Sequence, residues 1–294
     1  MTVSIAKCLA PTRRPRKPVT EFPAGSVDTH VHVFASQYEL SPDRGYTPPV
    51  STVDDLQNMH RTIGIERVVL TQPSVYGTDN SAILDAVDVL NAETPHRARA
   101  VVALDMSVSD EELRRLDDRG VRGIRINTDN KGGMPISWSD LPRMCDRIAP
   151  LGWHVEFLFP GREMVKMAAT LRDLPVPTSI AHFAYQPAAD GVEAKGFQAL
   201  LSLVRAGNTW VKISGADRVT SVGPPGYDDV APLAQALLET APDRIMWATD
   251  WPHPNKYDHT PDDGDLVDAL GSWIDDPDLR GAVLIDNPAL FYHF

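Results

Sequence analysis

Two histidines and an aspartate have types and spacing suited to hydrolytic chemistry. His30 and His32 lie two residues apart in VDTHVHVF, and side chains at that spacing in a strand point to the same face. Asp250 ends the apolar run of WATDWPHP, where Pro252 stops the strand. Imidazoles and a carboxylate can bind a metal ion, and a carboxylate can also take a proton from water. These residues are the first candidates for catalysis, provided that the fold brings them together.

A third histidine and a second carboxylate follow the same pattern. His182 lies near the end of TSIAHFA, and Glu156 shares a face of HVEFLF with His154. A buried carboxylate needs a cation or a hydrogen-bond donor, so Glu156 is either a metal ligand or part of an internal pair. His154 begins its segment, which indicates a structural role. Each histidine alone could be a hydrogen-bonded core residue, whereas the combination favours a site.

Positively charged side chains follow two further segments. Arg125 in GIRIN and Arg218 in GADRV come at segment ends, and a planar guanidinium matches a carboxylate or a sulfonate. The two arginines predict an anionic substrate, unless both form surface ion pairs. Lys131 in NKGG would add a third positive charge. The neutral candidates for substrate binding are Tyr46, Ser74, Tyr76, Thr78 and Asn255.

Short β-branched segments alternate with helical patterns from residue 26 onward, which indicates βα units. Strands are expected at 27–34, 67–72, 98–104, 123–127, 154–159, 178–183, 210–214 and 245–249. Helices are expected at 53–63, 79–92, 109–119, 140–151, 162–171, 196–205 and 227–240, with closing helices at 266–274 and 286–292. This count predicts a single (β/α)8 TIM barrel, an α/β fold with its active site at the carboxyl ends of the strands. An open doubly wound sheet has less support, because no Gly-rich phosphate turn follows a strand.

Length and charge limit the other possibilities. The 294 residues carry a formal net charge of −12, which argues against nucleic-acid binding and against an anionic membrane surface. No apolar run approaches the roughly 20 residues of a membrane span. Cys8 and Cys145 form neither a disulfide framework nor a metal cluster, and the cytoplasm is the expected compartment.

The chain divides into an arm and a barrel. Residues 1–22 are rich in basic residues and prolines, but they lack the apolar segment of an export signal. We expect a flexible N-terminal arm over 1–22 and one barrel over 23–294. The sequence leaves open whether the chain forms a homo-oligomer.

Several segments together resemble the amidohydrolase superfamily, and more closely its branch of 2-pyrone-4,6-dicarboxylate lactonases and related lactone-processing enzymes. The likeness runs from about Pro23 to the C-terminus. It rests on VDTHVHVF, PSVYGTDN, GIRIN, IAHFA, ADR at 216–218 and, most specifically, WATDWPHPN followed by PDDG. The resemblance implies a lactonase, that is, a carboxylic ester hydrolase that opens an acidic lactone ring, as in the bacterial breakdown of aromatic compounds.

The resemblance also implies roles for individual residues. In the pyrone lactonases the residue matching Asp250 acts as general base on water. Histidines surround the scissile carbonyl and arginines bind the substrate carboxylates, and their matches here are His30, His32, His182, Arg125 and Arg218.

Three positions depart from the pyrone lactonase pattern. Tyr185 stands where an arginine follows the sixth-strand histidine, Leu158 replaces a tyrosine on the fifth strand, and Lys131 lies near another expected arginine. Tyr185 therefore joins the candidate substrate-binding residues. The changes argue against the pyrone dicarboxylate itself as substrate, while lactone chemistry remains the expectation.

The resemblance leaves the metal open, because pyrone lactonases work without one while sulfomuconolactone hydrolases use zinc. No lysine ends the fourth strand to bridge two ions, so the expectation is no metal or one divalent ion, zinc or manganese, and no organic cofactor. The ligands of that ion would be His30, His32, His182 and Asp250, with Glu156 as a further candidate.

Three other functions are possible. A metal-dependent decarboxylase of this superfamily would have a histidine at the end of the fifth strand, where this chain has Leu158 and Phe159. The galactarolactone isomerases of this superfamily lack an aspartate matching Asp250. A non-catalytic barrel that binds a small acid would need no general base. Hydrolysis of a small anionic lactone is therefore the favoured prediction.

Overall fold

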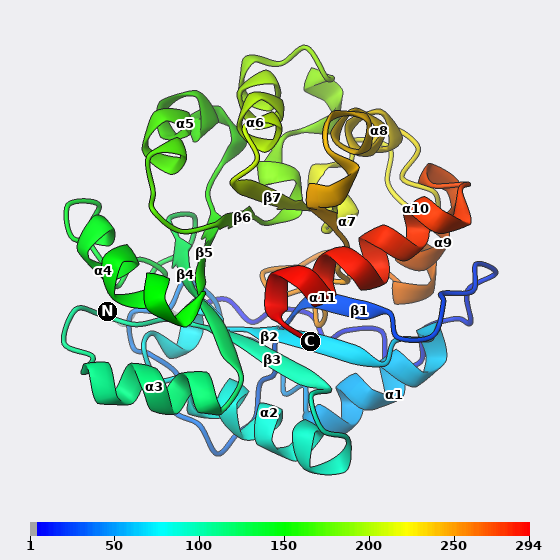
Figure 1. Ribbon diagram of the computed structural model, residues 1–294. Coiled ribbons are helices and arrows are strands. Elements are labelled where there is room, and N and C mark those ends of the chain that lie inside the picture. The colour runs from blue at the N-terminus through cyan, green and yellow to red at the C-terminus, as the bar shows by residue number, and fades with distance from the viewer. Residues whose placement is uncertain (1–4) are drawn as a thin grey trace.

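The computed structural model describes residues 5–294 and contains one sheet of eight parallel strands, ordered as in the sequence (Figure 1). The strands are β1 (Val27–Val31), β2 (Arg67–Thr71), β3 (Ala98–Val102), β4 (Val121–Asn127), β5 (His154–Leu158), β6 (Thr178–Ile180), β7 (Thr209–Lys212) and β8 (Ile245–Met246). Beyond β8 the chain continues along β1, where Thr29 N–H donates to the carbonyl of Trp247 (3.2 Å) and Asp250 N–H donates to that of His30 (3.0 Å). These bonds close the ring, and the predicted (β/α)8 barrel is confirmed.

Helices surround the strands on the outside (Figure 1). They are α1 (Val53–Ile63), α2 (Ser81–Glu93), α3 (Asp110–Asp118), α4 (Leu141–Ile148), α5 (Met164–Arg172), α6 (Lys195–Arg205), α7 (Ala216–Val219), α8 (Ala231–Thr240), α9 (Asp263–Trp273), α10 (Pro277–Gly281) and α11 (Asn287–Tyr292). The nine predicted helices are all present, with ends shifted by a few residues. The short helices α7 and α10 were not predicted, because neither is long enough to show a periodic pattern.

Seven of the eight strands end earlier than the sequence suggests, and three of them end three residues earlier. The first, sixth and eighth were expected to continue to residues 34, 183 and 249. After β6, the residues from His182 to Tyr185 all have φ between 50° and 55°, a left-handed conformation that cannot continue a strand. The chain bends at these points because it turns into the loops that carry the candidate site residues.

The amino-terminal end of the barrel is sealed by an apolar cluster. It contains Val27, Val69, Val101, Trp210, Met246, Phe291 and Tyr292. In Figure 1 the C-terminal helix α11, coloured red, crosses this end of the barrel. Arg99 fixes it there, since its guanidinium donates to the carbonyls of Tyr292 (3.2 Å) and His293 (2.5 Å). We call this cluster the floor.

The N-terminal arm is packed against the barrel over residues 5–22; residues 1–4 lie outside the described part. Leu9 N–H donates to the carbonyl of Lys256 (2.8 Å), and Lys7 forms a β-bridge with Thr47. Arg16 pairs with Asp265 (2.5 Å) and Asp268 (2.6 Å) of α9. The arm over residues 5–22 thus differs from the loose segment that was expected, because Arg16 pairs with acidic side chains of α9 and the arm backbone bonds to the barrel loops.

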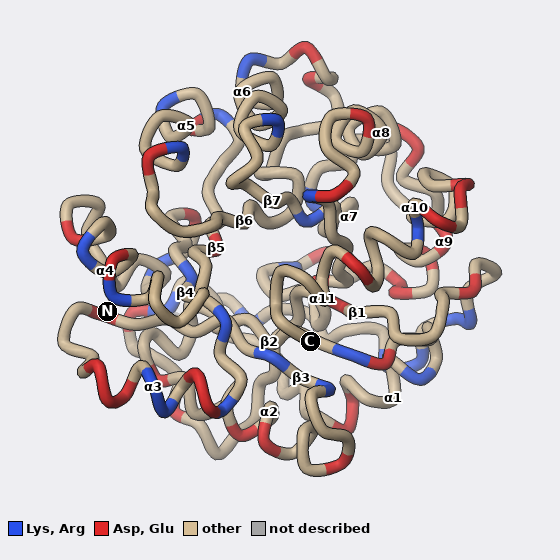
Figure 2. Tube along the Cα trace, viewed as in Figure 1, with Lys and Arg blue, Asp and Glu red and all other residues tan. Residues whose placement is uncertain are grey.

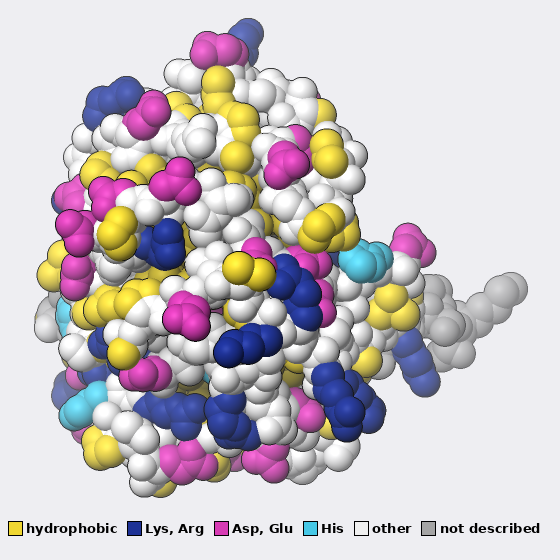
Figure 3. Space-filling view, turned by 90° about the vertical axis from the view of Figure 1, so that its right-hand side faces the viewer, with side chains coloured by type: hydrophobic (Ala, Val, Ile, Leu, Met, Phe, Trp, Pro, Cys, Tyr) yellow, Lys and Arg dark blue, Asp and Glu magenta, His cyan; other side chains and the backbone are white. Residues whose placement is uncertain are grey.

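Charge is spread over the outer surface. Figure 2 shows Asp and Glu distributed over the outer helices and their loops. On the face shown in Figure 3, hydrophobic side chains alternate with side chains of both charges. Within residues 5–294, none of the helices is both long and apolar enough to cross a membrane.

Candidate active site

Three histidines and one aspartate converge at the carboxyl end of the barrel. His30 comes from β1, His32 follows it, His182 follows β6, and Asp250 follows β8. Asp250 Oδ1 lies 3.7 Å from the Nε2 atoms of both His30 and His32 and 3.5 Å from that of His182. All four side chains are buried. The structure therefore brings together the four residues that the sequence singled out.

The other ring nitrogen of each histidine is held by a different partner. His32 Nδ1 lies 2.7 Å from the carbonyl of Thr71, which can only accept, so this nitrogen carries the proton. His182 Nδ1 shares a hydrogen bond with Ser214 Oγ (2.8 Å). Within residues 5–294, His30 Nε2 has no hydrogen-bond partner although it is buried. For His32 the geometry therefore presents a nitrogen lone pair toward Asp250 Oδ1.

Arg218 holds the second oxygen of Asp250. Its Nε and Nη2 atoms lie 2.6 and 2.5 Å from Oδ2, and Nη2 also donates to the carbonyl of Pro254 (2.9 Å). Burial would raise the pKa of Asp250, but Arg218 and the three histidines hold that pKa well below its usual value. Asp250 is therefore a carboxylate, and Oδ1 is the oxygen left free for chemistry.

The histidines are neutral at ordinary pH. Burial lowers the pKa of His182 to about 4 and also lowers the pKa values of His30 and His32. Positive side chains nearby, such as Arg125, contribute in the same direction. Neutral imidazoles are the form that binds a metal ion.

A buried ion pair lies beneath His30. Lys212 at the end of β7 and Glu156 on β5 are both fully buried and in direct contact, and Lys212 Nζ also donates to the carbonyl of Thr29 (2.7 Å). Glu156 Oε1 lies 3.1 Å from His30 Nδ1. Burial would raise the pKa of Glu156, but Lys212 and Arg125 lower it, so Glu156 is also charged.

The position of Glu156 bears on the expected metal ligands. Single ligand atoms of His30, His32 and Asp250 lie within 4.8 Å of one another, and Glu156 does not belong to this group. Glu156 approaches His30 from the opposite ring nitrogen. It is thus placed behind a candidate ligand, which is the internal-pair alternative considered from the sequence.

The donor set fits a single divalent cation. Two nitrogens with lone pairs and one carboxylate oxygen face the same point, and Nε2 of His182 lies close to that oxygen. Lone pairs at these distances repel one another unless a proton or a cation lies among them. His182, a predicted ligand, lies outside the group of ligand atoms within 4.8 Å, which contains His30, His32 and Asp250. Two histidine nitrogens and one carboxylate oxygen are a ligand set typical of catalytic zinc.

The cavity above these residues is small. It encloses about 20 Å³, which is room for about one water molecule. Five of the predicted substrate-binding residues line it, namely Tyr46, Arg125, Tyr185, Arg218 and Asn255. Arg125 is the cation with donors to spare: Nη1 binds the carbonyl of Gln72 (2.7 Å), while Nε has no hydrogen-bond partner among the described residues.

The four other predicted substrate-binding residues do not line this cavity. Tyr76 packs beside Phe34, and its hydroxyl accepts from Ala35 N–H (3.3 Å). Ser74 begins the short turn that carries Tyr76, while Thr78 and Lys131 are exposed. Their loops turn away from the barrel axis, so proximity to a strand end in the sequence was not sufficient.

Several residues at the site were missed in the sequence. Lys212 and Ser214 alternate with Trp210 in TWVKIS, and a lysine inside an apolar strand was the available signal. Asn127 and Asn130 also line the cavity, and Asn127 ends the predicted fourth strand. A count of polar residues at every strand end would have found Asn127.

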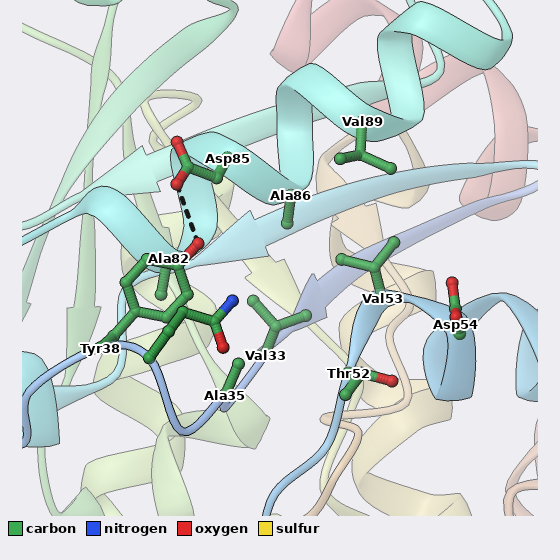
Figure 4. Close-up of a pocket in the computed structure, with 11 residues that line it drawn as sticks. Val33, Ala35, Tyr38, Thr52, Val53, Asp54, Ala82, Asp85, Ala86 and Val89 are labelled. Carbon is green, nitrogen blue, oxygen red and sulfur yellow. Dashed lines mark hydrogen bonds between the residues drawn. The ribbon is translucent and has the colours of Figure 1, made fainter.

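A larger groove lies outside the barrel mouth, between α1 and α2, with a volume of about 280 Å³ (Figure 4). Its wall is mostly aliphatic and includes Val33, Val53 and Val89. Tyr38 donates to Asp85 (2.8 Å) at its edge. Its lining contains no histidine and no cation, so the candidate site remains the mouth of the barrel.

Comparison with known proteins identifies a family, related sequences and a related structure. The family model described as amidohydrolase matches residues 27–294. The chain is 35% identical to the 2-pyrone-4,6-dicarboxylate hydrolase of Comamonas testosteroni, over 95% of this chain and 93% of that protein. It is also 35% identical to the 4-sulfomuconolactone hydrolase of Hydrogenophaga intermedia, over 97% and 94%. A probable 2-pyrone-4,6-dicarboxylic acid hydrolase from Acinetobacter baumannii, solved with citric acid bound, superposes with a TM-score of 0.79 at 25% identity, over 92% of this chain and all of that one.

Proposed function

This chain belongs to the amidohydrolase family, and we propose that it is a lactonase that hydrolyses a small lactone carrying a carboxylate or sulfonate group. The observation that carries the proposal is the free Oδ1 of Asp250 facing three histidines, with Arg125 and Arg218 in the wall of the same cavity. The two relatives act on lactones of this kind according to their names. We further propose that the reaction belongs to the breakdown of aromatic compounds.

In the proposed reaction Asp250 is the general base. Its Oδ1 takes a proton from water as the water oxygen bonds to the lactone carbonyl carbon. When the bond between that carbon and the ring oxygen breaks, Asp250 or one of the histidines returns a proton to the ring oxygen. The product is an open-chain hydroxy acid or its keto form. Arg218 keeps Asp250 ionised between turnovers and fixes its orientation.

The histidines would act next to the scissile carbonyl. His30, His32, His182 and Asp250 would hold the cation, zinc or manganese, if the enzyme uses one, and it would supply stabilisation of the negative charge that develops on the carbonyl oxygen. The protein's own contribution is to keep the three imidazoles neutral and correctly turned. Thr71 and Ser214 do this for His32 and His182.

The acidic group of the substrate would bind to Arg125. This side chain lines the cavity and is 5% exposed; its Nη1 binds the carbonyl of Gln72, and its Nε is on the side of Glu156 (3.9 Å). Tyr185 and Leu158 make the wall less cationic than an arginine would, so we propose a substrate with fewer or differently placed anionic groups than the pyrone dicarboxylate.

The test is an assay of carboxylated and sulfonated lactones, each with and without added zinc or manganese. Ring opening adds one water to the substrate mass, whereas isomerisation of the lactone leaves the mass unchanged, so mass spectrometry separates the two reactions. Calorimetry on the same panel detects binding without turnover. Tight binding of a lactone that stays intact would replace the proposal with the non-catalytic alternative.

A further inference from the structure

The buried ion pair beneath the site has a function that follows from its geometry. Lys212 and Glu156 are fully buried, and placing two charges in the barrel interior is costly unless each is well paired. An apolar pair of similar volume would usually fold at least as well. The pair is also not on the cavity wall, so neither residue can touch a substrate. Its immediate neighbour is His30.

The hydrogen-bonding capacity of this pair determines where His30 carries its proton. Lys212 Nζ donates to the carbonyl of Thr29 and to Glu156 Oε2. Glu156 Oε1 is left without a well-formed hydrogen bond among the described residues; His30 Nδ1 lies 3.1 Å from it and Arg125 Nε lies 3.9 Å from it. A carboxylate oxygen beside a nitrogen lone pair is repulsive, and the contact at Nδ1 (3.1 Å) is shorter than that of Nε2 with Asp250 Oδ1 (3.7 Å). The Nδ1 atom of His30 therefore carries the proton, pointing toward Glu156.

The competing arrangement has longer contacts. Lys212 Nζ lies 3.4 Å from His30 Nδ1 and could donate to it, which would place the imidazole proton on Nε2. That Nε2 proton would face Asp250 Oδ1 at 3.7 Å, too far for a hydrogen bond. The arrangement would also leave Glu156 Oε1 facing a lone pair. The geometry therefore favours the Nδ1-protonated form.

We propose that Lys212 and Glu156 are positioning residues that fix His30 with its Nε2 lone pair directed at Asp250. Glu156 selects the tautomer of His30, and Lys212 fixes Glu156 so that Oε1, rather than Oε2, faces the imidazole. Thr71 performs the same task for His32 through a backbone carbonyl. Each of the three histidines thus has its own partner at Nδ1: Thr71 for His32, Ser214 for His182 and the Lys212–Glu156 pair for His30.

The sharpest variant is E156Q, which keeps the shape of the side chain. Lys212 can only donate, so it will bind the amide oxygen and turn the amide NH2 toward His30 Nδ1. Nδ1 must then accept, and the proton of His30 moves to Nε2. We expect the ¹⁵N chemical shifts of the two imidazole nitrogens to show this reversal in histidine-labelled protein. The signals of His30 are assigned as those that are missing from the spectrum of H30N.

Two further measurements test how the proton shift in E156Q affects zinc binding and catalysis. Zinc titration of the apoprotein should show about 10- to 100-fold weaker binding in E156Q, because a misoriented second partner of a histidine typically costs that much. On a lactone that the wild type hydrolyses, kcat should fall by a similar factor while KM stays within about threefold. The kcat measurement rests on the proposed lactonase activity; the tautomer measurement does not, so the two proposals can fail separately.

Controls separate positioning from folding. The double variant E156L/K212M removes both charges and leaves no unpaired one, so it should fold but show no tautomer preference at His30 and reduced kcat. R99M removes a different buried cation, at the floor, and should lower the melting temperature while leaving the His30 tautomer and kcat unchanged. A wild-type His30 protonated on Nε2, or an E156Q protein that retains the Nδ1 proton, would overturn the proposal.

Discussion

The carboxyl and amino ends of the same eight strands differ in the side chains that they bury. At the carboxyl end, buried polar groups face one another around a small cavity, and Asp250 and His182 have left-handed backbone conformations. At the amino end, the floor is a packed cluster in which the ring of Phe291 lies 4.4 Å from that of His154 and 4.8 Å from that of Trp210. Function and stability are therefore located at different ends, as expected for this architecture.

The comparison is sharpest for buried histidines. His30 and His32 each have a partner at Nδ1 and direct Nε2 at Asp250. His154 at the floor has no hydrogen-bond partner for either nitrogen among residues 5–294, and its ring covers Gly123, where a Cβ would lie within 2.8 Å of ring atoms. His30 and His32 are thus candidates for chemistry because their Nε2 atoms converge on one carboxylate, whereas the contacts of His154 are those of a packing residue.

The largest expected effect is at the mouth, from D250N. The amide cannot take a proton from water, so kcat should fall by about 10²- to 10⁴-fold on any lactone the wild type opens. The unfolding free energy should also fall, because the amide leaves Arg218 without its counter-charge, so the kinetics are compared under conditions where the variant is folded. Steady-state kinetics and urea unfolding measure the two quantities. Hydrolysis within tenfold of wild type would exclude Asp250 as the base.

The matching change at the floor is F291A. Loss of a buried aromatic ring should lower the unfolding free energy by about 3–5 kcal/mol. At a temperature where the variant is folded, kcat should stay within about twofold of wild type, since the floor approaches the site at the Tyr292 ring, 5.6 Å from Lys212 Nζ, and F291A leaves that ring in place. If kcat instead falls as the protein remains folded, the two ends are coupled more closely than the contacts indicate.

R125M tests the substrate side of the mouth. Losing charge-assisted hydrogen bonds to an anionic group costs about 1.5–3 kcal/mol, so kcat/KM should fall by about 10- to 100-fold. The loss should be much smaller on a lactone without an acidic group. Equal losses on both substrates would indicate that Arg125 supports the site rather than binds the anion.

The smallest effect concerns pH and the floor. Burial lowers the pKa of His154 to about 3, so between about pH 3 and 6.5 the unfolded chain binds a proton that the folded chain does not. Stability therefore rises with pH across this window, and at pH 5 the loss relative to pH 7 is about 2 kcal/mol from this residue. In H154F the loss of stability between pH 7 and pH 5 that His154 causes should disappear, as urea unfolding at both pH values would show. An unchanged difference would mean that other groups, such as the histidines at the mouth, determine the acid sensitivity.

Much of the fold and the centre of the site could be predicted from the sequence. Period-two spacing placed His30 and His32 on one face, and the βα alternation fixed which end of the barrel carries His182 and Asp250. The supports behind the histidines could not be predicted in this way. The contact between Lys212 and Glu156 joins β7 to β5 across the barrel interior, and a sequence pattern within one strand carries no information about such a contact.

The positions of loop residues were the second feature that could not be predicted from the sequence. Ser74, Thr78 and Lys131 follow strand ends, whereas Arg125 lies within β4, and a loop can leave the barrel axis within a few residues. The docking of the arm was also missed, because the acidic partners of Arg16 lie almost 250 residues away. Charge composition indicated that the arm was basic, but it did not indicate which surface would bind it.

The docking of α11 has a consequence for how the barrel folds. Phe291 and Tyr292 complete the floor, and the carbonyls that Arg99 binds belong to Tyr292 and His293. The contact between Arg99 and Tyr292 spans 193 residues of chain. Closing so long a loop has a high entropic cost, so we expect the floor to form late in folding, after neighbouring strands have paired.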